Sequence, residues 1–111
     1  MQPPVMGIKI ATWNVNSLNV RLPQVLDWLH AQQPEILALQ ETKVADPAFP
    51  TLDIAEAGYQ AVFSGQKTYN GVAVLSRRPA REIVTDLPGA NDPQRRVLGA
   101  TLGDLRVINL Y

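Results

Sequence analysis

The first forty residues switch between two hydrophobic periods. Residues 8–14 (IKIATWN) are apolar and β-branched at their start, which is typical of a strand. Residues 22–32 (LPQVLDWLHAQ) place apolar side chains at i, i+3, i+4 and i+7, which predicts an amphipathic helix with Pro23 in its first turn. Residues 35–41 (EILALQE) contain a continuous apolar run that predicts a strand buried on both faces. This order predicts a βαβ unit with two parallel strands.

After residue 43 the pattern changes to shorter runs. Residues 44–58 are proline-rich and mixed in polarity, which predicts a loop with a short helix near residues 51–57. Further runs typical of strands are residues 59–64, 71–76, 81–86, 95–102 and 105–111. Residues 102–105 (LGDL) predict a two-residue hairpin turn, and residues 87–94 predict a turn-rich loop.

These patterns predict an α/β chain with a mixed sheet, in which one βαβ unit is followed by mainly antiparallel strands. Residues 1–7 are expected to be an N-terminal extension, and residues 8–111 to form one folded unit. The sequence stops at Tyr111, directly after a strand-like run. We therefore expect this chain to be part of a longer protein.

Composition narrows the functional classes only slightly. The 111 residues are 46% hydrophobic and 18% charged, as in an ordinary small globular domain, and the formal net charge is zero. Net charge therefore favours neither a nucleic-acid partner nor an acidic one. Cysteine is absent, which excludes a disulfide scaffold and thiolate chemistry and agrees with an expected cytoplasmic location. No apolar run approaches the ~20 residues that cross a bilayer, so no membrane association is expected.

Polar residues follow two strands that should be neighbours. Asn14 ends the first predicted strand and Glu41 ends the second. Ligands of α/β sheets bind beyond the carboxyl ends of strands, so we expect these two side chains at one edge, joined by Tyr111 if the last strand points the same way. A lone carboxylate with amide neighbours suits Mg²⁺. The single histidine, His30, lies on the polar side of the predicted helix, so a zinc site is not supported.

Each of these residues also has an ordinary structural interpretation, which is the commoner one when the pattern is taken alone. A glutamate such as Glu41 often ends a strand as a solvated loop residue, and an asparagine such as Asn14 often forms a turn. The Tyr-Asn-Gly of residues 69–71 is a strong hairpin signal by itself. The arginine pairs at residues 77–78 and 95–96 are typical of solvated charges at strand edges.

Five segments taken together favour the functional interpretation over the ordinary structural one. IKIATWNVNSL, ILALQETK, TYNGVAVLS, DPQRRV and VINLY, in this order and at these spacings, resemble the exonuclease III family. These Mg²⁺-dependent DNA repair nucleases include the apurinic/apyrimidinic endonucleases and belong, with DNase I, to the endonuclease/exonuclease/phosphatase superfamily. The resemblance implies that residues 8–111 are the N-terminal portion of such a domain. The family fold is a four-layer α/β sandwich whose two similar halves pack sheet on sheet.

The resemblance also assigns roles to residues. Glu41 matches the metal-binding glutamate, and Asn16 matches a position that helps near the metal. Asn14 matches an active-site asparagine, and Tyr111 matches the tyrosine that points at the scissile phosphate. Lys43 matches a basic residue that would keep the neighbouring carboxylate ionised.

The remaining matches concern the substrate. Tyr69 and Asn70 match a turn that contacts DNA, and Arg96 matches an arginine that contacts the DNA backbone. The family often has Asn-Gly-Leu-Arg where this chain has Asn-Ser-Leu-Asn at residues 16–19, so an expected arginine is missing and Arg21 is the candidate replacement.

The function implied for the intact protein is hydrolysis of DNA phosphodiester bonds. The implied cofactor is Mg²⁺, with Mn²⁺ as an alternative. The implied partner is double-stranded DNA, at an abasic site or a 3′ end, and the enzyme is expected to be a monomer. The family's histidine and further aspartates lie in a second half. This chain alone is therefore expected to be inactive and to expose the apolar inner face of its sheet.

Two other functions stay open at the level of sequence. Another phosphoesterase of the superfamily, acting on inositol phosphates or phospholipids, would share the asparagine and the glutamate. A non-catalytic fragment that only binds DNA or a partner chain would need no complete site. The QETK, YNG and RRV segments favour the nuclease branch.

Overall fold

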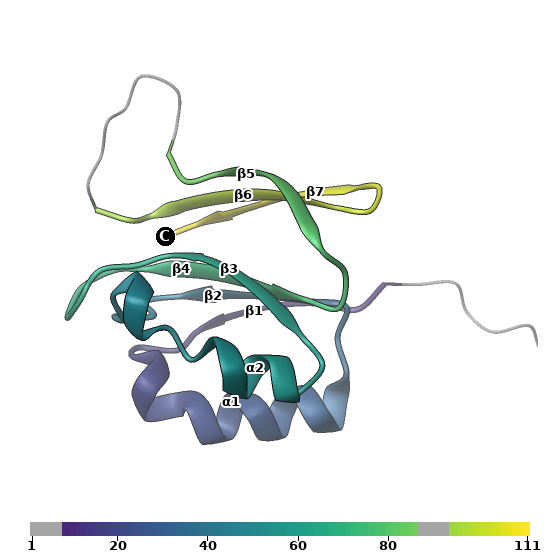
Figure 1. Cartoon of the computed structure of the whole chain (residues 1–111), viewed down its shortest axis with the longest axis horizontal. Coiled ribbons are helices and arrows are strands. Elements are labelled where there is room, and N and C mark those ends of the chain that lie inside the picture. The colour runs from purple at the N-terminus through teal and green to yellow at the C-terminus, as the bar shows by residue number, and fades with distance from the viewer. Residues whose placement is uncertain (1–7, 87–93) are drawn as a thin grey trace, which may run out of the picture.

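The computed structural model describes residues 8–86 and 94–111. Two β-sheets pack face to face, and both α-helices lie on the outer face of one of them (Figure 1). The expected N-terminal extension, residues 1–7, lies outside the described residues, and so does most of the expected loop at residues 87–94. Within the described residues, no helix has the length and apolar character needed to span a bilayer.

The first sheet contains the predicted βαβ unit. Its strands run in the order β1-β2-β4-β3, and β1 pairs with β2 in parallel while the other pairs are antiparallel. The bounds are β1 Ile10–Asn14, β2 Ile36–Gln40, β3 Gln60–Ser64 and β4 Val72–Ser76. The central strands β2 and β4 are buried almost throughout, as the continuous apolar run of β2 predicts. The mixed sheet is therefore confirmed.

Helix α1 (Leu18–Gln32) is longer than its hydrophobic period predicts. It begins at Leu18 rather than at Leu22, because the side chain of Leu18 is fully buried and its N–H donates to the carbonyl of Thr42. The expectation that Pro23 lies in the first turn is therefore wrong. Pro23 is exposed inside the helix, where water can satisfy the carbonyl that loses its N–H partner.

The helical side of the first sheet carries the larger core. It buries side chains of α1, β2 and β4 together with Ile54 of the predicted short helix, α2 (Thr51–Glu56). A short 3₁₀ turn, Asp46–Ala48, precedes α2, and Phe49 after it stacks on Phe63 with ring centroids 4.0 Å apart.

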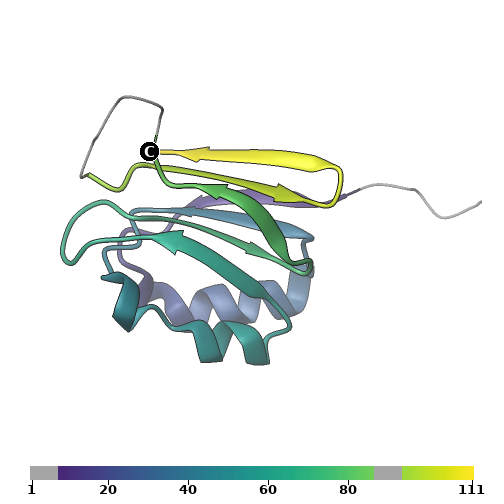
Figure 2. The same ribbon diagram turned by 45° about the horizontal axis from the view of Figure 1, so that its top comes forward.

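The second sheet consists of antiparallel strands in the order β5-β6-β7 (Figure 2). Their bounds are β5 Ala80–Val84, β6 Val97–Leu102 and β7 Leu105–Leu110. The predicted hairpin turn is confirmed, since Leu102 pairs with Leu105 and Gly103 has a φ of 61°.

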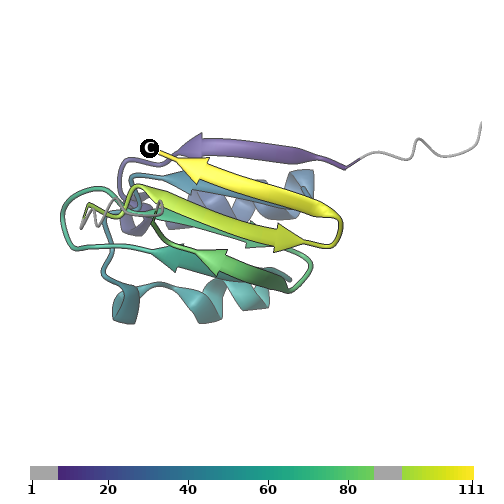
Figure 3. The ribbon, with the colours of Figure 1, turned by 90° about the horizontal axis from the view of Figure 1, so that it is seen from above.

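This second sheet corrects the expectation of an exposed inner face. It covers the first sheet, and the two share an apolar layer that contains Ile36, Val74 and Leu98. Seen from above, β7 runs on the β1 side and β5 on the β3 side, and the carboxyl ends of β1 and β7 point the same way (Figure 3). The margin along β1 and β7 stays open, as a cleft of about 560 Å³ with Ile10 and Ile108 on its walls. The chain thus contributes strands to both sheets of a sandwich.

Two loops approach each other closely at Gly71. It has a φ of 97°, and a Cβ there would lie 2.2 Å from the hydroxyl of Thr42. Gly58 has a similar φ of 92° but open space around the corresponding Cβ. The two glycines therefore share the backbone strain that alanine would suffer, and only Gly71 adds a steric clash.

We expect Gly71→Ala to destabilise the fold by more than Gly58→Ala does. The control should cost about 1–2 kcal/mol from backbone strain alone, and the clash with Thr42 should add to this at Gly71. Urea-induced unfolding of both variants of the full-length protein measures the difference. Equal losses for the two variants would show that the loops separate without cost.

Candidate active site

Three segments that are distant in sequence meet at the carboxylate of Glu41. Asn14, at the end of β1, donates from Nδ2 to Glu41 Oε1 at 3.0 Å. Tyr111, directly after β7, donates from its hydroxyl to the same oxygen at 2.6 Å. Because β1 and β2 are parallel, their ends carry Asn14 and Glu41 to one edge of the sheet, as the sequence predicts.

Lys43 and Asn16 lie on the other side of this carboxylate. Lys43 Nζ is 3.6 Å from Glu41 Oε2 and donates to Asn16 Oδ1 at 2.6 Å. The backbone N–H of Asn16 donates to Asn14 Oδ1 at 3.1 Å. The two oxygens of Glu41 therefore differ, since Oε1 accepts neutral donors and Oε2 faces a cation.

Strained backbone is concentrated around this carboxylate. Glu41 and Lys43 both have a φ of 55°, in the left-handed region that side chains other than glycine rarely adopt. Asn16, Asn70 and Arg95 in the adjoining loops also have positive φ values. Each such residue costs about 1–3 kcal/mol and persists only where the surroundings enforce it. Clusters of this kind are typical of functional sites.

Backbone hydrogen bonds between loops enforce this conformation. The carbonyl of Glu41 accepts from the N–H of Ser17 at 2.8 Å, and the N–H of Lys43 donates to the carbonyl of Asn70 at 2.9 Å. Gly71 in turn donates to the carbonyl of Arg95 at 3.1 Å. The loops that follow β1, β2 and β3 therefore hold one another, and the backbone at and after Glu41 is held by both neighbouring loops.

The hydrogen bonds to Glu41 change the pKa values of Glu41 and Tyr111. The pKa of Glu41 is lowered from its ordinary value of 4.5, mainly by the hydrogen bond from Tyr111, then by that from Asn14, with a smaller contribution from Lys43. The pKa of Tyr111 is raised from its ordinary value of 10.0, mainly because its hydroxyl donates to Glu41. The expectation that Lys43 keeps the carboxylate ionised thus holds in direction, but neutral donors contribute more.

The donor set fits a hard divalent cation. Glu41 Oε2 and Asn16 Oδ1 already flank one positive charge, the ammonium of Lys43. Mg²⁺ takes oxygen ligands, commonly one or two carboxylates completed by water and substrate phosphate. Among residues 8–86 and 94–111, no three histidine, cysteine, aspartate or glutamate side chains gather. A cation at this edge would therefore take Glu41 as its carboxylate ligand and Asn16 as an amide neighbour.

The residues predicted to contact substrate lie around this edge but are not all in contact with it. Arg96 is exposed, donates from Nη1 to the carbonyl of Tyr111 at 3.3 Å, and has its guanidinium carbon 5.2 Å from the centre of the tyrosine ring. Asn70 contacts Lys43 through its backbone, whereas the neighbouring Tyr69 is 67% exposed. Arg21 is half-buried in the first turns of α1.

Sequence reasoning missed a supporting ion pair beside the turn at residues 69–71. Asp46 Oδ1 accepts from the N–H of Gly65 at 2.7 Å, and its Oδ2 lies 3.8 Å from Arg95 Nη1. The same arginine nitrogen is 3.2 Å from Ser64 Oγ. These contacts hold the start of the loop between β3 and β4. No spacing in the sequence indicates that Asp46 and Arg95 meet.

Sequence reasoning also missed Asn109, the buried polar residue of β7. The available signal was an amide within the apolar run INL, a position where burial requires hydrogen-bond partners. Its hydrogen-bond partners come from the first sheet.

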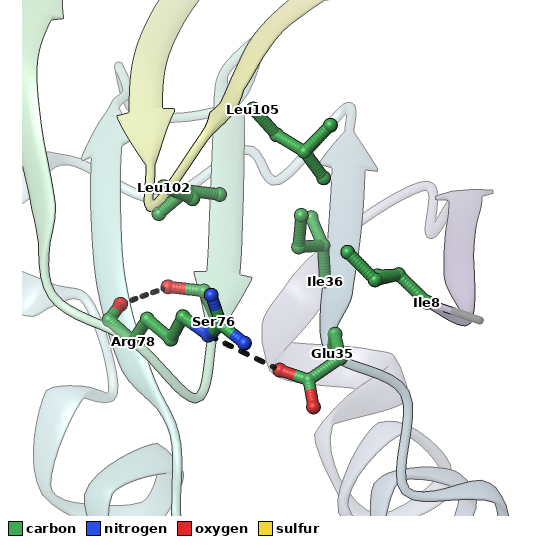
Figure 4. Close-up of a pocket in the computed structure, with 7 residues that line it drawn as sticks. All are labelled: Ile8, Glu35, Ile36, Ser76, Arg78, Leu102 and Leu105. Atoms are coloured by element: carbon green, nitrogen blue, oxygen red, sulfur yellow. Dashed lines mark hydrogen bonds and ion pairs between the residues drawn. The ribbon is translucent and has the colours of Figure 1, made fainter. Parts of the chain in front are cut away.

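A second, small pocket lies at the opposite end of the strands (Figure 4). Its volume is about 10 Å³, and Ile36 and Leu102 are among the apolar side chains that line it. Glu35 and Arg78 form a 4.0 Å ion pair at its rim, and Ser76 donates to the carbonyl of Arg78 at 2.6 Å. Space for about one water and polar groups that pair with each other indicate a structural feature rather than a site.

This chain is similar in sequence and in structure to known proteins. The model of the Endonuclease/Exonuclease/phosphatase family matches residues 11–111. The chain belongs to this family. The predicted family and the α/β fold class are therefore confirmed, and the Glu41 edge is the candidate active site of an endonuclease/exonuclease/phosphatase domain.

Individual members of the endonuclease/exonuclease/phosphatase family are closely similar to this chain. The structure of the 3′ phosphatase NExo from Neisseria, bound to a product DNA hairpin, is 52% identical with a TM-score of 0.92, and the match covers 95% of this chain and 41% of that one. An AP endonuclease from Archaeoglobus fulgidus is 41% identical with a TM-score of 0.91, over 95% and 41% of the two chains. Exodeoxyribonuclease III of Haemophilus influenzae is 38% identical over 109 residues, which are 94% of this chain and 41% of that protein. The chain thus spans about two fifths of these relatives.

The pKa shifts give a direct test of the site geometry. A lowered folded-state pKa means that the contacts of Glu41 stabilise the fold above pH 4.5, and that this contribution is lost as the pH falls through the lowered value. We expect Tyr111→Phe to raise the pKa of Glu41 toward 4.5, because it removes the largest cause of the shift. Carboxyl-carbon NMR titration measures it, with Tyr69→Phe as the control. An unchanged Glu41 titration in Tyr111→Phe would contradict the hydrogen bond.

Proposed function

We propose that the protein carrying this chain is a divalent-metal-dependent hydrolase of DNA phosphoester bonds, with Glu41 as its metal ligand. The observation that carries the proposal is the convergence of Asn14 and Tyr111 on Glu41 Oε1, while Oε2 faces Lys43. Relatives named for nuclease and 3′ phosphatase activity on DNA support the same reading. Mg²⁺ is the proposed cofactor and Mn²⁺ a substitute, because the donors are hard oxygens.

The residues of this chain would act chiefly by positioning and by charge. Asn14 and Tyr111 lock the Glu41 carboxylate in one orientation, so that Oε2 stays directed toward the cation position. The bound metal would polarise a phosphate oxygen and offset charge that develops on the leaving oxygen. Lys43 would add a fixed positive charge beside the same phosphate. We propose that the group that takes the proton from water belongs to the part of the protein outside this chain.

The proposed substrate surface surrounds this edge. Arg96, Tyr69 and Asn70 lie on the loops beside Tyr111 and Lys43, and Arg21 lies near the start of α1. Contacts of this kind hold the DNA backbone and fix its register, without reading base sequence. Because the chain has zero net charge, attraction of DNA would come from the basic side chains at this edge rather than from the chain as a whole.

We further propose that phosphate groups at DNA 3′ ends are the preferred substrate, with abasic sites as the second candidate. The 3′ phosphatase NExo is 52% identical to this chain, compared with 41% for the AP endonuclease from Archaeoglobus fulgidus. Asn19 also replaces the arginine that the exonuclease III family often has at that position. Loss of a basic contact to a phosphate would change how the duplex is positioned on the protein.

Substitution of the metal ligand tests the reaction class. We expect Glu41→Gln to lower the rate of phosphoester hydrolysis by the full-length protein by about a hundred-fold or more, because it removes the charge that holds the cation. EDTA should abolish the wild-type activity and Mg²⁺ should restore it. Glu56→Gln, on the exposed face of α2, is the matched control and should retain full activity. Wild-type rates in Glu41→Gln would reject the proposed metal role.

Three DNA duplexes and one inositol phosphate separate the candidate activities. The full-length protein is given duplexes with a 3′ phosphate, an abasic site or an ordinary 3′ hydroxyl end, and in parallel an inositol phosphate. We expect release of the 3′ phosphate to exceed abasic incision by about ten-fold or more in kcat/KM, about 1.4 kcal/mol of transition-state discrimination. Faster abasic incision would assign an AP endonuclease instead. Turnover of inositol phosphate without turnover of DNA would move the protein to the phosphatase branch of the family.

A further inference from the structure

A buried amide lies directly beneath the candidate site. Asn109 of β7 is 4% exposed, and its Nδ2 donates to the carbonyl of Leu39 at 2.9 Å and to that of Ala73 at 2.8 Å. Leu39 and Ala73 are paired residues on the neighbouring strands β2 and β4 of the opposite sheet. A carbonyl oxygen has two lone pairs, so it can accept such a bond as well as a strand-to-strand bond. The side chain of Asn109 therefore fastens the second sheet to the centre of the first.

The network continues from Asn109 to β1. Asn109 Oδ1 accepts from Gln40 Nε2 at 2.8 Å, and the same nitrogen of Gln40 is 2.8 Å from Thr12 Oγ1. One chain of hydrogen bonds thus joins β1, β2 and β4 of the first sheet to β7 of the second. Both polar atoms of the buried Asn109 amide therefore have hydrogen-bond partners, as burial of a polar group requires.

Each side chain of the network lies one or two residues before a residue of the candidate site. Thr12 lies two residues before Asn14, and Asn109 lies two residues before Tyr111. Residues two apart in a strand face the same side. Gln40 immediately precedes Glu41. The network is therefore one step below the Asn14–Glu41–Tyr111 cluster and connects the same three strands.

Apolar packing alone would not fix the distance between Tyr111 and Glu41. The layer between the sheets is otherwise formed by aliphatic side chains such as Val74 and Leu98, whose attraction is non-directional. The hydroxyl of Tyr111 must meet Glu41 across the two sheets at 2.6 Å, and productive sites tolerate only about 0.5 Å of displacement. Directional bonds from Asn109 to two strands set the register that this contact needs.

We propose that Asn109 is a positioning residue that places the Tyr111 hydroxyl on the Glu41 carboxylate by fixing β7 against β2 and β4. This inference rests on the proposed function only in treating Tyr111 as part of the reaction site. The placement itself is a property of the folded protein without DNA. Replacement of the amide by leucine, an apolar side chain with the same branching and number of heavy atoms, should therefore largely preserve the packing of the sheets and relax the position of Tyr111.

The test uses Asn109→Leu in the full-length protein and measures, in crystal structures of the variant and the wild type, the distance between the Tyr111 hydroxyl and Glu41 Oε1. We expect this distance, which is 2.6 Å here, to lengthen beyond hydrogen-bond range in Asn109→Leu. Gln60→Leu, an exposed site on β3, is the matched control and should leave the distance unchanged. A folded Asn109→Leu that keeps the Tyr111 hydroxyl within hydrogen-bond range of Glu41 overturns the proposal.

A milder variant keeps the proposal testable if Asn109→Leu does not fold. Thr12→Val removes only the outer bond of the network, and we expect a smaller lengthening of the Tyr111–Glu41 distance. Gln40→Met removes the bond to Asn109 Oδ1 and should give an intermediate lengthening. An unchanged Tyr111–Glu41 distance in both of these variants would equally overturn the positioning role.

Kinetics separate this inference from the proposed function. With a 3′-phosphate duplex, we expect Asn109→Leu to lower kcat by about ten- to a hundred-fold with little change in KM, as misplacement of a reacting group does. A longer Tyr111–Glu41 distance with wild-type kcat would support the positioning role and count against Tyr111 as part of the proposed reaction.

Discussion

The hydrogen bonds to the Glu41 carboxylate are the interaction on which the candidate site depends. Donors from β1 and from the end of β7 meet at one oxygen, and each is brought there by a different feature of the fold. The parallel pairing of β1 with β2 delivers Asn14, whereas the packing of one sheet on the other delivers Tyr111. A change that separates either pair of strands would therefore dismantle the same site.

The cost of this arrangement appears in the backbone. Glu41 and Lys43 adopt left-handed conformations, and the adjoining loops contribute further positive φ values at Asn16, Asn70 and Arg95. Hydrogen bonds between the loops offset this strain, so the polar edge is rigid although it is made of irregular segments. Rigidity is useful for a reaction that relies on positioning and electrostatics, because the donors need no reorganisation when charge develops.

Much of this site could be predicted from particular residues. Asn14 and Glu41 each end a strand of a recognisable βαβ pattern, and parallel strands bring their carboxyl ends together, so their proximity follows from local sequence. The start of α1 could not be predicted in this way, because the burial of Leu18 and its bond to Thr42 come from another part of the chain. The inner face was expected to be exposed for a similar reason, since nothing local to β5, β6 or β7 indicates that they form a second sheet.

The sequence by itself determined the elements apart from the start of α1, together with the family and the carboxylate at the end of β2. These depend on hydrophobic period, turn residues and contiguous motifs, which act over a few residues. The tertiary structure alone decided that Tyr111 and Asn109 reach Glu41 and β2 from the opposite sheet. Contacts between residues about seventy positions apart depend on how two sheets stack, and stacking is set by the summed burial of many side chains rather than by any one segment.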